Sequence, residues 1–123
     1  MDKRPIVHVE IPAKDRQYTA RFYADIFGWD YEDQPGPVPY TMFHSGNTGG
    51  GYPELSDMYK PGDVLIYIHS HDLEADLRQI EARGGTVITR EMEIPGFGQL
   101  AFFSDPAGNR IALWKTERAH LKV

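Results

Sequence analysis

The alternation of apolar and polar residues predicts a regular series of short elements in the first half of the chain. Residues 6–11 alternate, with His8 and Glu10 on one face and aliphatic side chains on the other, as in a half-buried strand. Asp15 then stands where an N-cap is expected, and residues 16–27 carry apolar side chains at helical spacing. Three further strands are expected to follow, at 29–32, at 40–44 and from about residue 50.

The same series restarts in the second half of the chain. Asp72 follows Asp15 by 57 positions, and Gly85 follows Gly28 by the same 57 positions. Each helix thus has a matching N-cap, and Gly28 is expected to end the first helix and the pair Gly84-Gly85 the second. Strands are expected at 63–70, 86–89, 99–103 and 111–115. The repeat predicts one α+β domain over residues 1–123, built from two tandem βαβββ modules at about 4–55 and 62–116.

Composition narrows the class of protein. A length of 123 residues suits one domain, and 12 glycines with 9 prolines fit many short elements joined by turns. The absence of cysteine excludes disulfides, thiolate metal sites and a thiol nucleophile. A net charge of −5 argues against a nucleic-acid partner. No apolar run predicts a secretory signal or a membrane span, so we expect a cytoplasmic protein without a membrane partner.

Four segments carry a resemblance to a known family: 8–12, 21–29, 93–98 and the closing stretch from Asp105 to Trp114. On these segments the chain resembles the glyoxalase / bleomycin-resistance / ring-cleaving dioxygenase superfamily, also called the vicinal oxygen chelate family, and within it the small single-domain glyoxalase-like members. The resemblance implies that the two modules form a curved, open-barrel sheet around a central cleft. It also implies that the protein is a homodimer.

The resemblance further implies a divalent metal ion (Zn, Ni, Fe or Mn) in the cleft, held by four side chains in the members that use one. Carried over residue by residue, the first ligand falls on His8 and the second near Glu54. The third falls on Leu65 and the fourth on Ala112, neither of which can bind a metal. Because a divalent ion needs about three protein donors, we expect a degenerate metal site and no cofactor.

Several side chains are candidates for contact with a ligand in the cleft. An inward pair of His8 and Glu10 could bind a ligand or satisfy each other. The indole of Trp114 suits an apolar or aromatic ligand, and Arg110 could fix a carboxylate or lie in solvent. The full set of expected ligand-binding residues is His8, Glu10, Met42, Tyr67, His69, Arg110 and Trp114.

Two further groups have a weaker functional interpretation. His69 and His71 form an H-x-H pair, but two donors without a third make a poor metal site, so His69 is expected as a polar group of the pocket. Aromatic side chains at helical and strand spacing are expected in the core; they are Phe22, Tyr23, Phe27, Trp29 and Phe102.

The sequence leaves three functions open. The leading one is a protein that binds or sequesters a small organic molecule. The second is a metal-dependent lyase, isomerase, epimerase or dioxygenase that uses His8 and Glu54 with His44 or His69 as a third ligand. The third is a non-catalytic interaction module whose cleft is filled by side chains. A shared fold cannot choose among them, and no catalytic residue is assigned.

Overall fold

The computed structural model describes residues 3–116, and this part of the chain repeats the order βαβββ twice. The first series is β1 (Ile6–Glu10), α1 (Arg16–Phe27), β2 (Asp30–Gln34), β3 (Tyr40–His44) and β4 (Gly49–Tyr52). The second series is β5 (Leu65–His69), α2 (Leu73–Ala82), β6 (Thr86–Ile94), β7 (Gly98–Ser104) and β8 (Arg110–Thr116). The predicted α+β class and the tandem βαβββ order are confirmed. Neither helix of the described residues has the length and apolarity needed to cross a bilayer.

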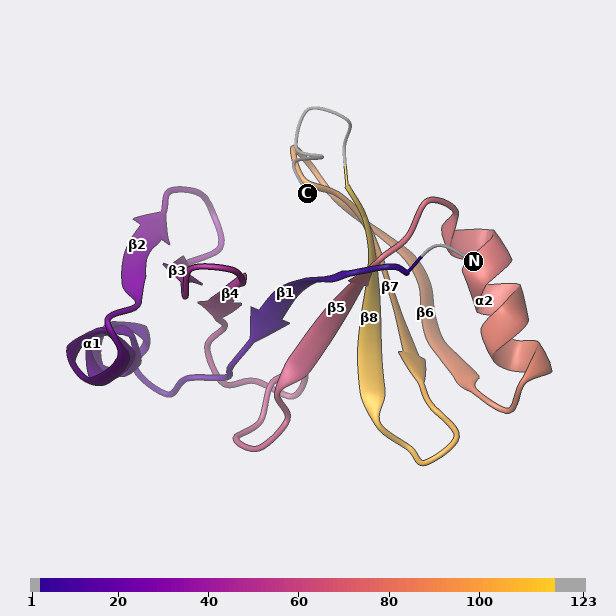
Figure 1. Ribbon diagram of the computed structural model, residues 1–123, viewed down its shortest axis with the longest axis horizontal. Helices are drawn as coiled ribbons and strands as arrows, with labels where there is room; N and C mark the ends of the chain where they lie inside the picture. Colours follow the sequence, from indigo (N-terminus) through magenta and orange to yellow (C-terminus); the bar gives the residue numbers. More distant parts are fainter. Residues whose placement is uncertain (1–2, 117–123) are drawn as a thin grey trace. The chain divides into compact units, whose positions relative to one another are not determined.

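The described chain divides into two compact units. The first unit is His8–Leu65, and its strands lie in the order β2-β3-β4-β1, with β1 parallel to β4 and the other neighbours antiparallel (Figure 1). Helix α1 covers one face of this sheet. The core between them holds the buried side chains Ala13, Ala20, Phe43 and Tyr52, flanked by Val9, Ile11, Tyr23, Trp29 and Tyr31.

The second unit combines residues 66–116 with residues 3–7. Its strands lie side by side in the order β5-β8-β7-β6, with β5 parallel to β8 (Figure 1). The chain's first described residues are tied to this unit: Arg4 donates two hydrogen bonds to Asp76, and the His69 amide donates to the Pro5 carbonyl at 3.0 Å. Helix α2 covers one face over a core of Leu73, Leu77, Ala101, Phe103 and Leu113.

Both helices begin and end where the sequence predicts, and within the pair Gly84-Gly85 the two glycines have different roles. The carboxylates of Asp15 and Asp72 each accept a hydrogen bond at 3.1 Å from the amide three residues on, which confirms both N-caps. Gly28 adopts a left-handed φ of 74° after α1. After α2 the left-handed residue is Gly84, with φ 95°, and not Gly85. Gly85 is required for a different reason, because a Cβ there would collide with Ile80.

The aromatic residues of α1 divide between the core and the surface. Tyr23 stacks on Trp29 at 5.1 Å between ring centroids, and Phe102 is buried in the other unit, as predicted. Phe22 and Phe27 remain 50% and 60% exposed, so the prediction that they are core residues is wrong. The sheet covers the face of α1 that carries Ala20 and Tyr23, and Phe22 lies outside this face. Phe27 is on the same face as Tyr23 and its ring meets Tyr23 and Trp29, but it is the last residue of the helix and remains largely exposed.

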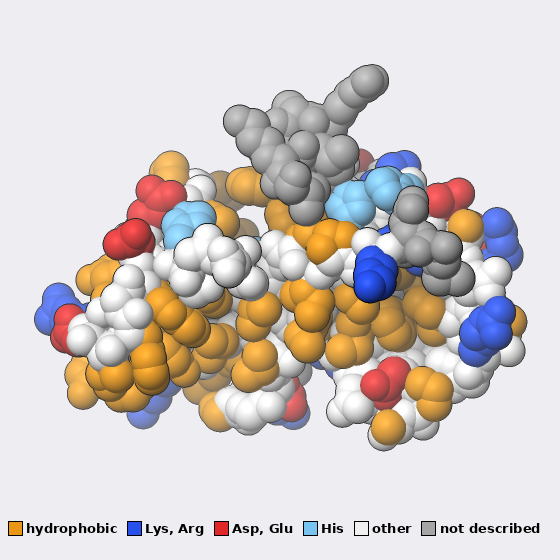
Figure 2. Space-filling view, in the orientation of Figure 1, with side chains coloured by type: hydrophobic (Ala, Val, Ile, Leu, Met, Phe, Trp, Pro, Cys, Tyr) orange, Lys and Arg blue, Asp and Glu red, His pale blue; other side chains and the backbone are white. Residues whose placement is uncertain are grey.

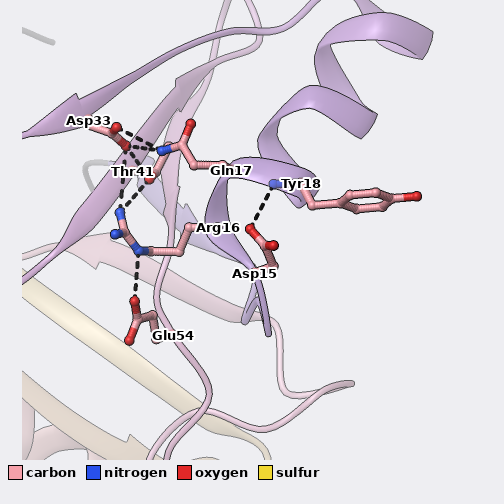
Figure 3. A network of polar contacts seen from close by, with 7 residues as sticks. All are labelled: Asp15, Arg16, Gln17, Tyr18, Asp33, Thr41 and Glu54. Atoms are coloured by element: carbon pink, nitrogen blue, oxygen red, sulfur yellow. Dashed lines mark hydrogen bonds and ion pairs between the residues drawn. The ribbon is translucent and has the colours of Figure 1, made fainter.

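A polar network fixes the first turn of α1 to the sheet of the first unit (Figure 3). The Arg16 guanidinium donates to the Thr41 hydroxyl at 2.7 Å and to Glu54 at 3.1 Å. Thr41, fully buried on β3, in turn donates to Asp33 on β2, and Gln17 donates to the same carboxylate. Because each polar group here has a partner within the network, we assign it a structural role.

The glycines of β4 allow an unusually close approach to that strand. A Cβ on Gly50 would overlap the carbonyl of Val9 on the parallel neighbour β1. A Cβ on Gly51 would overlap the ring and hydroxyl of Tyr40 from β3. The Tyr40 ring therefore lies directly against the backbone of β4, which only glycine permits at that position.

We expect Gly51→Ala to lower the free energy of unfolding by about 1–3 kcal/mol, because the new methyl group displaces the Tyr40 ring. Urea unfolding followed by circular dichroism measures the change. The same substitution in a Tyr40→Ala background is the control, since the ring that collides is then absent. An equal loss in both backgrounds would show that Tyr40 is not the cause.

Candidate functional site

In each unit the expected ligand-binding residues lie on the sheet face opposite the helix. In the first unit β3 alternates: Thr41 and Phe43 face α1, whereas Tyr40 and Met42 take the other side with His8 and Glu10 of β1. In the second unit the residues of β5 and β8 that pack under α2 are Ile68, Ile111 and Leu113. The alternate residues on those two strands are Tyr67, His69, Arg110, Ala112 and Trp114.

A chain of hydrogen bonds joins the two polar side chains of β1 through a tyrosine. The Tyr40 hydroxyl donates to Oε2 of Glu10 at 2.6 Å. Nε2 of His8 lies 2.8 Å from the same hydroxyl, and the rings of His8 and Tyr40 are stacked. His8 and Glu10 themselves are 4.0 Å apart, so the tyrosine connects them.

The direction of these bonds determines the tautomer of His8. A phenol has one hydrogen to donate, and Tyr40 gives it to Glu10. The short contact with His8 is then a hydrogen bond donated by Nε2–H to the phenol oxygen. In this tautomer Nε2 carries a proton and offers no lone pair to a metal ion.

Burial keeps His8 and Tyr40, the two ring members of this hydrogen-bond chain, uncharged. Burial lowers the pKa of His8 below its usual 6.5, although Glu10 opposes the shift. Burial and the adjacent Glu10 raise the pKa of Tyr40, which therefore remains a hydrogen-bond donor throughout the physiological range. The first unit thus presents a neutral imidazole and a neutral phenol, both oriented by one buried carboxylate.

The other predicted residues of the first unit are placed apart from this chain. Met42 pairs with Gly51 across the β3–β4 ladder, on the same face as Tyr40. Glu54, the second expected metal ligand, is 60% exposed and forms an ion pair with Arg16. His44, at the end of β3, is exposed.

In the second unit Trp114 connects the sheet to the turn between β6 and β7. Its indole N–H donates to the carbonyl of Phe97 at 3.0 Å. The ring of the buried Tyr67 meets the indole edge-on, with 6.4 Å between centroids. Two expected ligand-binding residues therefore form one aromatic surface, and the turn 95–97 is held beside it.

Arg110 and His69 lie on the same sheet face. The Arg110 guanidinium lies over the ring of Phe102 at 5.6 Å, a cation–π geometry. His69 is only 4% exposed, and within residues 3–116 its Nε2 has no hydrogen-bond partner. Burial lowers the pKa of His69, and the nearby His71 and Arg4 lower it further. The ring of His71 meets that of His69 edge-on at 4.6 Å.

The donor set expected for a metal is incomplete in the described part of the chain. Leu65 and Ala112, at the third and fourth ligand positions, are buried aliphatic side chains. Across residues 3–116, no cluster of three or more His, Cys, Asp or Glu is arranged to hold a metal ion. The assignment of His8 and Glu54 as metal ligands therefore stays a prediction.

Alternation along the strand expected at 40–44 puts Tyr40 on the same face as Met42, but nothing in the sequence assigns Tyr40 a role. The residue becomes important only through the registers of three strands, which bring its hydroxyl between two alternate residues of β1. The glycine run facing Tyr40 across the hairpin was the available signal, because a strand of glycines leaves space for a ring.

Two relatives illustrate the sequence comparison. The anthracycline biosynthesis protein DnrV of Streptomyces peucetius is 28% identical over 131 residues, covering 86% of this chain and 45% of that protein. A glyoxylase-like domain-containing protein of Didymella fabae is 27% identical over 113 residues, covering 85% of this chain and 88% of its own length. The chain thus spans about half the length of DnrV.

Solved structures share the fold at low sequence identity. The protein BH1468 of Bacillus halodurans has a TM-score of 0.75 at 16% identity, covering 95% of this chain and 97% of that one. A methylmalonyl-CoA epimerase of Mycobacterium tuberculosis has a TM-score of 0.69 at 14% identity, covering 93% and 89%.

A family model matches residues 5–113, which include the first βαβββ series, most of the second and six of the seven expected ligand-binding residues, all but Trp114. The chain belongs to the Glyoxalase/Bleomycin resistance protein/Dioxygenase superfamily.

Proposed function

We propose that this chain binds a small organic molecule without the help of a metal ion. The observation that carries the proposal is the hydrogen-bond chain from His8 through Tyr40 to Glu10. His8 stands at the first of the family's metal-ligand positions, and in this chain of hydrogen bonds its Nε2 donates a proton to Tyr40 instead of binding a metal ion. The remaining positions do not compensate, because Glu54 is paired with Arg16, and Leu65 and Ala112 carry no donor. The residues present do not fit the family's metal.

The helix-free face of each unit, taken by itself, suits a particular kind of chemical group on a ligand. In the first unit, the partly buried His8 and Tyr40 are neutral and oriented, so they favour an uncharged hydroxyl or carbonyl group. In the second unit, Trp114 and Tyr67 offer ring surfaces and Arg110 offers a charge for a carboxylate. A relative named for the biosynthesis of an anthracycline, a polycyclic aromatic compound, agrees with an aromatic ligand.

The neutral state of His8 predicts a loss of stability in mild acid. Its folded-state pKa lies below the value of 6.5 for the unfolded chain, so between these two values the unfolded chain binds the extra proton. The contribution of neutral His8 to the free energy of unfolding is therefore fully present above about pH 7 and is lost as the pH drops below 6.5. The pKa of His69 is also lowered, so His69 adds a loss of the same sign. Urea unfolding at about pH 7.5 and about pH 5.5 measures the loss.

His8→Gln removes one of the two titrating groups, so the loss between the two pH values should shrink. Val38→Ser, at a position that is 73% exposed and carries no titratable group, should leave it unchanged. A loss of the same size in His8→Gln and in the unaltered protein would contradict the proposed neutral state of His8.

The metal-free proposal predicts that untagged protein retains no stoichiometric metal. The protein is equilibrated with Zn, Ni, Mn and Fe(II) in turn, passed through a desalting column and analysed by elemental mass spectrometry. Less than about one-tenth of an equivalent is expected, because fewer than three donors hold such ions weakly. One equivalent of metal that disappears in His8→Ala but persists in Asp63→Ala, a change at an exposed position with no expected ligand role, would overturn the proposal in favour of the metal-dependent enzyme.

Ligand binding predicts a rise in melting temperature with selected compounds. Thermal shift against aromatic and carboxylate-bearing molecules should give increases of several degrees, since a ligand that binds only the folded state stabilises it. The increase should be lost in Trp114→Leu and in Tyr40→Phe.

Tyr52→Phe is the matched control, since the Tyr52 hydroxyl is buried without a hydrogen-bond partner among the described residues. Its removal should leave the shift intact. No shift with any compound class, or an equal shift in all three variants, would remove the support for a binding protein and favour the interaction module.

A further inference from the structure

The outward face of α1 carries a row of apolar side chains exposed to solvent. Tyr18, Phe22 and Ile26 follow one another at four-residue spacing and are 75%, 50% and 58% exposed. Figure 2 shows hydrophobic side chains gathered over the region of α1, with charged side chains of both signs at its edge. A helix that is apolar on the side away from its sheet is unusual in an isolated unit.

Two opposite charges lie within this row. Arg21 and Asp25 are one turn apart and, together with Tyr18, Phe22 and Ile26, line a shallow hollow of about 280 Å³. Among residues 3–116, neither charge forms an ion pair within 4.0 Å. The face therefore offers an apolar surface with one positive and one negative group that the unit itself does not use.

This arrangement is complementary to itself. If two copies of α1 pack antiparallel about a two-fold axis beside Phe22, Tyr18 of one copy meets Ile26 of the other. Arg21 then lies about 3 Å along the axis from the partner's Asp25, given a rise of about 1.5 Å per residue, so the side chains can span the offset. The symmetry repeats the contact, which gives two ion pairs around a core of aromatic rings.

The apolar surface exposed on the outward face of α1 is large enough to form the centre of a dimer interface. Buried side chains of this size cover about 150–250 Å² each, so the exposed fractions of Tyr18, Phe22 and Ile26 amount to roughly 300–400 Å² per copy. This lies within the range of about 300–600 Å² found for the largest apolar patch on a monomer, which is often functional. A standard interface covers about 800 Å² per partner, so the patch supplies its apolar centre and the charged rim supplies the rest.

We propose that the outward face of α1, formed by Tyr18, Arg21, Phe22, Asp25 and Ile26, binds the same face of a second copy of this chain. The two helices pack antiparallel, and Arg21 of each copy pairs with Asp25 of the other. The proposal does not depend on the identity of any ligand.

Sedimentation equilibrium of the untagged protein tests the proposal. The unaltered chain should be a dimer. Arg21→Glu brings two acidic groups together and Asp25→Arg brings two basic groups together, so each should raise the dimer dissociation constant at least about tenfold. Phe22→Ser should have an effect of similar size, because it removes the central ring.

Mixing the two charge variants gives the decisive result. Each variant repels itself, but a mixed pair of Arg21→Glu and Asp25→Arg restores both opposite-charge contacts. The mixture should therefore form a heterodimer with about the affinity of the unaltered protein, and so should the double variant Arg21→Glu/Asp25→Arg with itself.

Two controls show whether any exposed change would have the same effect. Arg78→Glu reverses an exposed charge on α2, and Val38→Ser removes an apolar side chain that is 73% exposed. Both should leave the dissociation constant unchanged, and circular dichroism should show that every variant is folded. A protein that is monomeric at every concentration, a dimer that ignores the α1 variants, or single variants that do not restore each other would overturn the proposal.

Discussion

The close approach of the Tyr40 ring to β4 is the contact on which the polar face of the first unit depends. Because position 51 has no side chain, the ring can lie against the strand and bring its hydroxyl to β1. One phenol then supplies a donor to Glu10 and an acceptor to His8. A buried carboxylate and a buried imidazole are both satisfied without direct contact, which avoids the cost of an unpaired buried group. The hydrogen bonds on this face therefore depend on glycine, which has no Cβ, at position 51.

The division of each sheet into two faces explains why the two series differ in chemistry while sharing a fold. The face under the helix is mainly apolar in both units, with Phe43 in one core and Leu113 in the other. The buried Thr41 on this face of the first unit is satisfied by Arg16 and Asp33. The opposite face has no helix to cover it and is free to diverge. In the first unit it carries a histidine, a tyrosine and a carboxylate, and in the second an indole linked to a turn.

Much of the fold could be read from the sequence, because strand alternation and N-caps are local signals. Asp15 and Asp72 fixed both helix starts, and the faces of β1 followed from its alternation. The exposure of Phe22 could not be predicted, since apolar residues occur on more than one side of α1 and periodicity does not say which side meets a sheet. The role of Tyr40 was hidden because it depends on register between strands distant in sequence, which turns and loops decide. The sequence also could not show that Gly84 supplies the left-handed φ while Gly85 permits close packing on Ile80. Both requirements are met by glycine, so they look the same in a sequence.

The attachment of residues 3–7 to the second unit has a consequence for how the chain folds. The Pro5 carbonyl and the Arg4 guanidinium find their partners at His69 and Asp76, more than sixty positions along the chain. During synthesis these first residues must wait until β5 and α2 have emerged, whereas His8–Leu65 can already close its own core. The first unit is thus topologically an insertion within the second. Loop-closure entropy makes the second unit the slower one to complete, and an alteration at the amino end of the chain would be felt in the half made last.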